Sequence, residues 1–126
     1  MNSERKVVVI CPVKNESWII QEFLSAASSF ADHIIIGDHG STDNTVQLAS
    51  QNSKVTIVAS KQSGFEEAAR RNELLAEARK FGLGNVVLSI DADEMLDPRF
   101  IAFGGIDEIK ELPIGTRMFF PHFNLK

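Results

Sequence analysis

The sequence contains a single cysteine, Cys11, so the chain cannot form an intramolecular disulfide. A lone cysteine fits a reducing compartment. Long apolar runs are also missing: the polar amino-terminal residues lead into only five apolar residues, 7–11, before Pro12. That run is too short for the apolar part of a secretion signal and far below the ~20 residues of a membrane span. We therefore expect a cytoplasmic protein without a transmembrane segment, and attachment to a membrane surface is left open.

Basic residues are not in excess. The chain has 13 Lys and Arg residues against 17 Asp and Glu residues, which gives a formal net charge of −4. A general nucleic-acid binder needs positive charge to neutralise a phosphate backbone, so no nucleic-acid partner is expected. With 44% hydrophobic and 24% charged residues, the composition is ordinary for a soluble α/β protein. The length predicts a single domain, residues 1–126, that buries roughly two-thirds of its unfolded surface.

Continuous apolar runs alternate with helical patterns along the chain. Strands are predicted at residues 7–11, 33–37, 55–59, 85–90 and 116–120. Pro12 is expected to end the first strand, because proline offers no backbone donor to a ladder. Helices are predicted at residues 16–30, from the turn at 40–43 to about 51, at 65–81, and from Asp97 onward. This order predicts an α/β fold with a mostly parallel sheet and helices on both faces.

Polar segments follow the first four predicted strands, at residues 12–16, 38–43, 60–64 and 91–94. In parallel α/β sheets the ligand site lies outside the carboxyl ends of the strands, where the strand order reverses. The segment Asp91-Ala92-Asp93-Glu94 brings three carboxylates together in four residues. Two carboxylates about 4 Å apart repel by roughly 4 kcal/mol at an effective dielectric near 20. The segment therefore predicts a hard cation, Mg²⁺ or Mn²⁺, whose shell substrate phosphates would complete.

Four of these features, in this order, resemble the family 2 glycosyltransferases of the GT-A fold, over about residues 6–100. Residues 12–16 (Pro-Val-Lys-Asn-Glu) resemble the family's segment after its first strand, and residues 38–45 resemble its Asp-x-Gly-Ser-Thr-Asp-x-Thr motif. Arg71-Asn72 resembles the Arg-Asn pair on the helix before the acidic strand. Residues 91–94 resemble the Asp-x-Asp metal motif, in the form common among lipopolysaccharide-core sugar transferases.

The resemblance implies a role for each part of a nucleotide-sugar site. The nucleoside would be held by Asp38, which accepts a hydrogen bond from the base, and by residues of the first segment: Pro12, Val13, Asn15 and Glu16. Arg71 would approach the nucleotide from the third helix. Asp91 would contact the ribose or a metal-bound water, and Asp93 would coordinate the Mn²⁺ or Mg²⁺ ion on the diphosphate. Such an ion neutralises the charge that develops on the leaving diphosphate.

The implied reaction moves a sugar from a nucleotide diphosphate donor, a UDP-sugar, to an acceptor hydroxyl with inversion. A glycan or a lipopolysaccharide precursor is the implied acceptor. In this family the carboxylate base lies well downstream of the metal motif, whereas this sequence ends at Lys126. We therefore expect the donor-binding portion of a transferase, inactive alone, with its catalytic base beyond residue 126. The alternative is a non-catalytic nucleotide-binding or interaction module that keeps the sheet.

Three other enzyme classes fit less well. In haloacid-dehalogenase-like phosphatases the Asp-x-Asp motif follows the first strand and has Thr or Val at its fifth position, whereas here it follows the fourth strand and that position is Met95. Sugar nucleotidyltransferases carry a glycine-rich loop after the first strand, which residues 12–16 replace. A dinucleotide-binding protein would need a Gly-x-Gly-x-x-Gly motif, and the sequence has none.

Several of the residues also allow purely structural interpretations. Asp43 and Asp97 precede predicted helices and suit a capping role. Arg70 and Arg71 follow Glu66 and Glu67 by four residues, a spacing that favours surface ion pairs. Trp18 is expected to cover the core from the first helix, and His122, which could approach the metal, is more simply a structural histidine.

Overall fold

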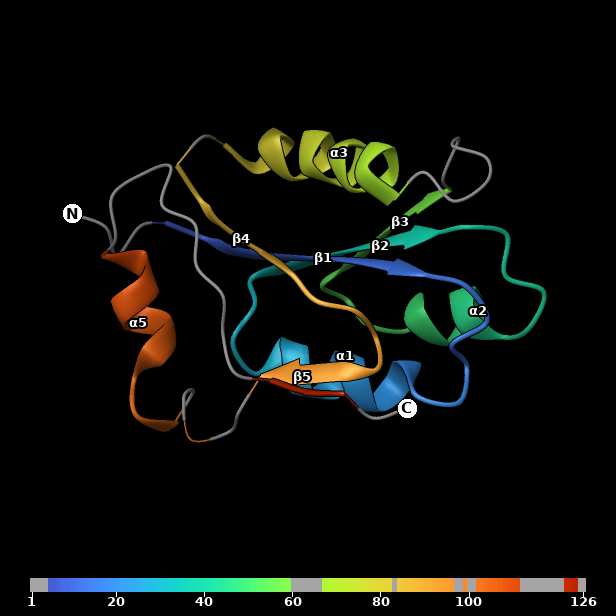
Figure 1. The fold of residues 1–126 in the computed structure, drawn as a ribbon, viewed down its shortest axis with the longest axis horizontal. Coiled ribbons are helices and arrows are strands. Elements are labelled where there is room, and N and C mark those ends of the chain that lie inside the picture. The colour runs from blue at the N-terminus through green and yellow to red at the C-terminus, as the bar shows by residue number, and fades with distance from the viewer. Residues whose placement is uncertain are drawn as a thin grey trace.

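The computed structural model describes residues 5–59, 67–82, 84–96, 99, 102–111 and 122–124. Its centre is a four-stranded sheet in the order β3-β2-β1-β4, and all three strand pairings are parallel. The strands are β1 (Val7–Val13), β2 (His33–Asp38), β3 (Val55–Ala59) and β4 (Val86–Ser89). Continuous β-branched runs are typical of strands buried on both faces. The predicted parallel α/β sheet is confirmed (Figure 1).

Two apolar clusters lie on opposite faces of the sheet. Alternate side chains of β1, such as Val9 and Cys11, pack with the buried face of α1 (Ile20–Ser28). The helix α2 (Thr45–Ala49) packs on the same face of the sheet. The intervening side chains, such as Ile10, pack with Leu74 of α3 (Glu67–Ala78), which continues as a 3₁₀ turn over Arg79–Phe81. Successive side chains of a strand point to opposite faces, so one apolar run serves both layers. Helices on both faces are therefore confirmed.

The helix α3 approaches β2 very closely because Gly37 has no side chain. A Cβ added at Gly37 would lie 2.7 Å from Cδ2 and 3.0 Å from Cδ1 of Leu74, which is inside normal contact distance. Leu74 itself is 2% exposed, so it fills the space that the glycine leaves. This close packing brings the amino-terminal turn of α3 down over the carboxyl ends of β1 and β2.

Pro12 does not end β1, contrary to the prediction from the sequence: the strand continues to Val13, which pairs with Asp38 of β2. The carbonyls of Val7 and Val13 accept hydrogen bonds on the β2 side, from Asp32 and His39. The carbonyl of Ile10 accepts from Ile90 on the opposite side, after β4. Alternate residues of a strand direct their backbone groups to opposite neighbours, so the missing donor of Pro12 faces β4 and leaves the β2 ladder intact.

The strand order reverses between β1 and β4, because β2 and β3 follow on one side of β1 and β4 lies on the other. The last hydrogen bond between the two runs from the Ile90 N–H to the Ile10 carbonyl, at 3.1 Å. Beyond it the chain leaves the sheet, and Pro12 offers no donor that would prolong the pairing. The reversal point therefore opens at its carboxyl end, between Pro12 and Asp91.

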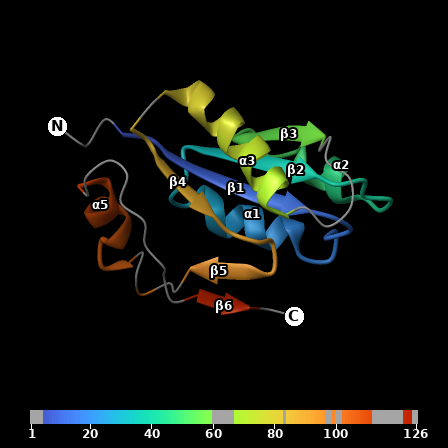
Figure 2. The same cartoon turned by 45° about the horizontal axis from the view of Figure 1, so that its top comes forward.

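A second, two-stranded sheet was not predicted from the sequence. The strand β5 (Glu94–Leu96) pairs antiparallel with β6 (His122–Asn124), below α1 in the view of Figure 2. The predicted strand at 116–120 and the predicted helix start at Asp97 lie outside the described residues. A final helix, α5 (Gly105–Lys110), is tied to the start of β1 by a 3.1 Å hydrogen bond from Arg5 Nη1 to the Lys110 carbonyl. Among the described residues, no helix is long and apolar enough to span a bilayer.

Candidate functional site

The loop after β1 and the loop after β2 are joined by side chain to backbone hydrogen bonds centred on Asn15. Its Oδ1 accepts from the backbone N–H of Thr42 at 2.7 Å and of Asp43 at 3.3 Å, and its own N–H donates to Ser41 Oγ at 2.9 Å. Asn15 has a φ of 54°, a left-handed conformation that asparagine tolerates better than most residues. The side chain therefore shapes the loop, and a nucleotide contact from Asn15 stays a prediction.

Asp43 makes a second connection between the same loops. Its carboxylate accepts from the backbone N–H and hydroxyl of Thr45 and, at 3.2 Å, from the backbone N–H of Ser17. Thr45 is fully buried, and its Oγ1 accepts from the Glu16 N–H at 2.9 Å. The hydrogen bond from the Thr45 side chain is the main cause that lowers the pKa of Asp43 to about 2, against the opposing effect of burial. Asp43 is not the N-cap of α2 as predicted, because that position is held by Asn44, which makes no side-chain cap hydrogen bond. Its carboxylate instead receives the N–H of the first helical residue, Thr45, and holds the loop after β1 through Ser17.

Asp38 lies at the carboxyl end of β2, beside these loops. Its carboxylate receives the Ser41 N–H at 3.3–3.4 Å, a long hydrogen bond within a local turn. Among the described residues this is the one partner given for Asp38, which leaves acceptor capacity toward solvent. The position and the unused acceptors are those that a base-binding carboxylate needs.

The structure places Val13 in the core and Glu16 beside an exposed Trp18, and the nucleotide contacts predicted for Val13 and Glu16 stay predictions. The Val13 side chain is 3% exposed and packs in the core, so only its backbone could meet a ligand. Trp18 is 52% exposed, which overturns the prediction that it covers the core. Its indole Nε1 donates to Glu16 Oε2 at 3.1 Å, so Glu16 holds this exposed ring rather than pointing at a cavity described here. The indole faces outward because Ile20, Phe23 and Leu24 already fill the buried face of α1.

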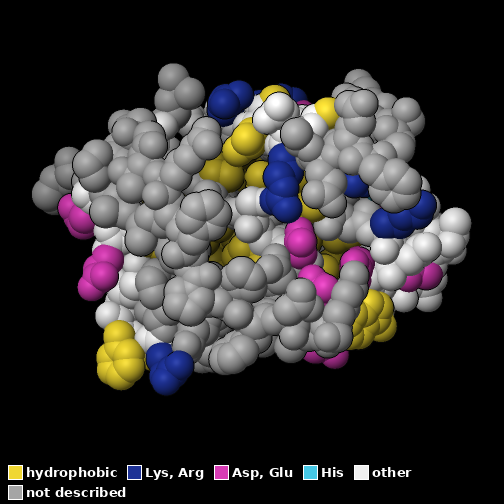
Figure 3. Space-filling view, viewed as in Figure 1, with side chains coloured by type: hydrophobic (Ala, Val, Ile, Leu, Met, Phe, Trp, Pro, Cys, Tyr) yellow, Lys and Arg dark blue, Asp and Glu magenta, His cyan; other side chains and the backbone are white. Residues whose placement is uncertain are grey.

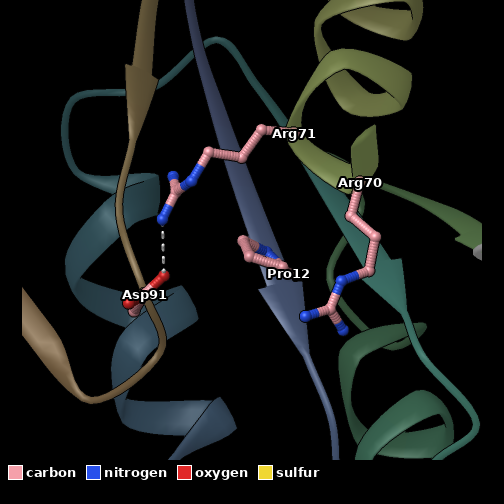
Figure 4. Close-up of a pocket in the computed structure, with 4 residues that line it drawn as sticks. All are labelled: Pro12, Arg70, Arg71 and Asp91. Atoms are coloured by element: carbon pink, nitrogen blue, oxygen red, sulfur yellow. Dashed lines mark ion pairs between the residues drawn. The ribbon is translucent and has the colours of Figure 1, made fainter. Parts of the chain in front are cut away.

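A small, partly open cavity of about 80 Å³ lies at the reversal point, lined by Pro12, Arg70, Arg71 and Asp91 (Figure 4). The Arg71 side chain extends over β1 to Asp91, with Nη2 and Oδ1 3.6 Å apart, and both side chains are partly exposed. Two residues that are 20 positions apart in the sequence, on α3 and after β4, thus meet on one side of Pro12 (Figure 4). Arg71 and Asp91, each predicted to contact the nucleotide, therefore lie at one cavity, and their ligand contacts stay a prediction.

Arg70 is the residue of this cavity that sequence reasoning missed. Its spacing from Glu66 favoured a surface ion pair, but Glu66 lies outside the described residues. In the structure the Arg70 side chain lines the cavity, and its Nε is buried without a hydrogen-bond partner among the described residues. Figure 4 shows Arg70 and Arg71 leaving α3 in different directions, on either side of Pro12. A signal for Arg70 was present in the sequence: it immediately precedes Arg71, about 100° away around the same helix.

The two carboxylates of the predicted metal motif have different surroundings. Asp91 lies at the cavity, half-exposed, whereas Asp93 is 6% exposed in the turn between β4 and β5. Within the described part of the chain, no three His, Cys, Asp or Glu side chains are grouped as metal ligands. Two carboxylates leave most of an Mg²⁺ or Mn²⁺ shell to water and phosphate oxygens, the usual arrangement where the substrate is a nucleotide. The side chains of Glu94 and His122 lie outside the described set.

Charged side chains of both signs adjoin on this face of the molecule. In Figure 3, basic and acidic side chains lie next to one another near the middle of the face, with exposed hydrophobic atoms beside them. A mixed patch of this kind suits a ligand that carries both an anionic group and a bound cation.

Comparison with known proteins gives this geometry its context. The family model described as "Glycosyl transferase family 2" matches residues 8–102. A solved structure of glucosyl-3-phosphoglycerate synthase from Mycobacterium tuberculosis, in complex with Mn²⁺, UDP and glucosyl-3-phosphoglycerate, is 24% identical. The match covers 82% of this chain and 40% of that chain, with a TM-score of 0.57. The same enzyme with Mn²⁺, UDP-glucose and phosphoglyceric acid is 23% identical, with 82% and 39% coverage and a TM-score of 0.55.

A further solved structure, described as a mycobacterial protein, is 19% identical, covers 89% of this chain and 39% of that one, and has a TM-score of 0.58. This chain therefore spans about 40% of the length of the solved structures that it matches. At such identities the structural matches establish the fold, which is that of GT-A glycosyltransferases. With the family model extending over three-quarters of its residues, the chain belongs to glycosyl transferase family 2.

Proposed function

We propose that this chain is the donor-binding part of a metal-dependent glycosyltransferase that takes a sugar from UDP-sugar to an acceptor hydroxyl with inversion. The observation that carries the proposal is the cavity at the β1–β4 reversal point. Its walls come from three separate segments of the predicted motifs: Pro12, Arg71 and Asp91. Ligands of open α/β sheets bind at this position.

The residues of the site divide into two groups. Asp38 and the loop that Asn15 and Asp43 hold would receive the nucleoside, with Asp38 accepting from the base N–H. Arg71 would face the nucleotide from α3, where its guanidinium can turn from Asp91 to a phosphate. The present 3.6 Å separation is long for a charge-assisted hydrogen bond, so little is lost when the pair opens.

The donor set of Asp91 and Asp93 fits Mn²⁺ or Mg²⁺, because both ions accept carboxylate oxygens and keep positions for phosphate and water. When bound, the ion supplies charge neutralisation on the leaving diphosphate. Asp93, fixed by burial in the turn before β5, would hold its carboxylate in one position, whereas the more exposed Asp91 can adjust to the ligand.

We take the catalytic base and the acceptor site to lie outside these 126 residues, which span about 40% of the similar solved structures. The proposed acceptor is a glycan or a lipopolysaccharide precursor. Transfer would then need a carboxylate from that further part to deprotonate the acceptor hydroxyl as it attacks the sugar.

Calorimetric titration with UDP, in Mn²⁺ and in EDTA, tests the proposal. We expect Mn²⁺ to tighten UDP binding, and Asp93→Asn to remove at least about tenfold of that enhancement, because it takes one metal ligand away. Asp107→Asn is the matched control, since it removes the same charge from an exposed position of α5. Absence of UDP binding in both buffers would refute the proposal and favour a non-catalytic interaction module.

A further inference from the structure

We propose that Arg70 forms an oxyanion subsite that binds the donor's diphosphate directly, without the metal ion. The inference rests on the proposed function and adds to it a residue outside the family motifs. Arg70 would be a specificity-determining residue of this chain, because it selects nucleotides that carry phosphate over nucleosides.

The first observation is an unpaired buried donor. Arg70 lines the cavity, and its Nε is buried without a hydrogen-bond partner in the described part of the chain. Buried polar atoms are almost always paired, and an unpaired donor on a charged group is especially unfavourable. A ligand in the cavity can supply this acceptor once the Arg70 side chain turns to expose Nε.

The second observation is the charge balance of the cavity. The positive charge of Arg71 is opposed by Asp91, with 3.6 Å between Nη2 and Oδ1. For Arg70 no carboxylate lies within ion-pair distance among the described residues. The lining of the cavity therefore has one uncompensated positive charge, at Arg70, and this favours an anion.

The geometry also separates the anion from the acidic residue. Arg70 and Arg71 extend to opposite sides of Pro12, and Asp91 lies on the side of Arg71 (Figure 4). A phosphate at Arg70 would therefore lie on the side of Pro12 away from Asp91, with less repulsion than one placed beside Arg71. The guanidinium presents a planar set of donors that matches two phosphate oxygens, which neither a lysine nor a neutral amide reproduces.

The backbone supports this position. Because Gly37 lets Leu74 descend onto β2, the turn of α3 that carries Arg70 lies low over the strand ends. The packing of α3 on the sheet thus determines the position of Arg70 at the cavity.

The test is performed in EDTA, so that no ion contributes. UDP and UMP are titrated by calorimetry, and uridine by NMR shifts, into the wild-type chain, Arg70→Gln and the control Lys80→Gln. Lys80 is an exposed cation paired with Glu77. For Arg70→Gln we expect UDP to bind about tenfold more weakly and uridine to change less than about twofold, as for one charge-assisted contact. Lys80→Gln should match wild type with every ligand.

Arg70→Lys separates charge from geometry. It keeps the positive charge and the aliphatic stem but has no Nε donor, so we expect it to recover only part of the loss. Thermal unfolding of both variants checks that the fold is kept. Equal losses for UDP, UMP and uridine would mean a base contact and overturn the proposal. Unchanged UDP binding in Arg70→Gln would overturn the Arg70 subsite and leave the proposed function standing. A wild-type chain that binds no UDP, with Mn²⁺ or with EDTA, would refute the proposed function as well.

Discussion

Substitution of Gly37 by alanine should disturb both the stability of the sheet and the cavity above it. The added Cβ would lie 2.7, 3.0 and 3.2 Å from three side-chain atoms of Leu74, which is 2% exposed. Overpacking of this kind costs about 1–3 kcal/mol. Alanine also reduces the freedom of the unfolded chain, which returns roughly 0.4–1 kcal/mol. We expect Gly37→Ala to lower the free energy of unfolding by about 1–2 kcal/mol.

The assay is urea unfolding of a double-mutant cycle at neutral pH. Leu74→Ala alone should cost about 2–5 kcal/mol, as for other buried leucines. In the double variant the new methyl group meets empty space, so its cost should disappear and the two effects should not add. UDP titration of Gly37→Ala should also show weaker binding, because an outward shift of α3 carries Arg70 and Arg71 with it.

The reasoning would be refuted by a Gly37→Ala variant that is as stable as wild type or more stable. Strict additivity in the cycle would also count against it, since it would mean that the two side chains do not compete for the same space. A stability loss without any change in UDP affinity would separate the packing argument from the argument about the cavity.

Two further predictions concern the loops after β1 and β2. Asp43→Asn should destabilise the chain at neutral pH, and because the Asp43 pKa is lowered to about 2, its stabilising effect is present above about pH 4 and lost as the pH falls toward 2. Urea unfolding of both chains at several pH values checks this, and a stability gap that stays constant down to pH 2 would contradict it. Asn15→Ala should cost about 1–3 kcal/mol, since it removes the acceptor of two backbone N–H groups and sets alanine at a φ of 54°. Asn15→Gly keeps the backbone relaxed, so a variant as unstable as Asn15→Ala would show that the hydrogen bonds dominate.

Much of the four-stranded sheet could be predicted because its strands have recognisable local sequence patterns. β1, β2 and β3 consist largely of consecutive β-branched residues, which predicts strands. The alternation of strands and helices then predicts a parallel sheet with helices on both faces. By contrast, β5 and β6 have only three residues each, too few to show a periodic pattern. They also pair across a long stretch of sequence, residues 94–96 with residues 122–124. Pro12 was misjudged for a related reason: whether a strand tolerates proline depends on which neighbour its nitrogen faces.

The site was predictable to a similar degree. Sequence motifs indicated Asp38, Arg71 and Asp91, and two of these three line one cavity with Pro12. The same motifs could not separate side chains that face a ligand from those that support it. Asn15 and Asp43 connect loops, Val13 is buried in the core, and Glu16 holds the exposed Trp18.

The sequence by itself determined the family, the layered parallel architecture and the segments that gather at the carboxyl ends of the strands. These depend on residue type and on short spacings, which the chain carries whatever its final packing. Only the tertiary structure decided that Arg71 meets Asp91, that Asp93 is buried while Asp91 is not, and that Arg70 has a buried donor without a partner. These are properties of contacts between segments that are distant in the sequence, and such contacts depend on how helices and strands pack together.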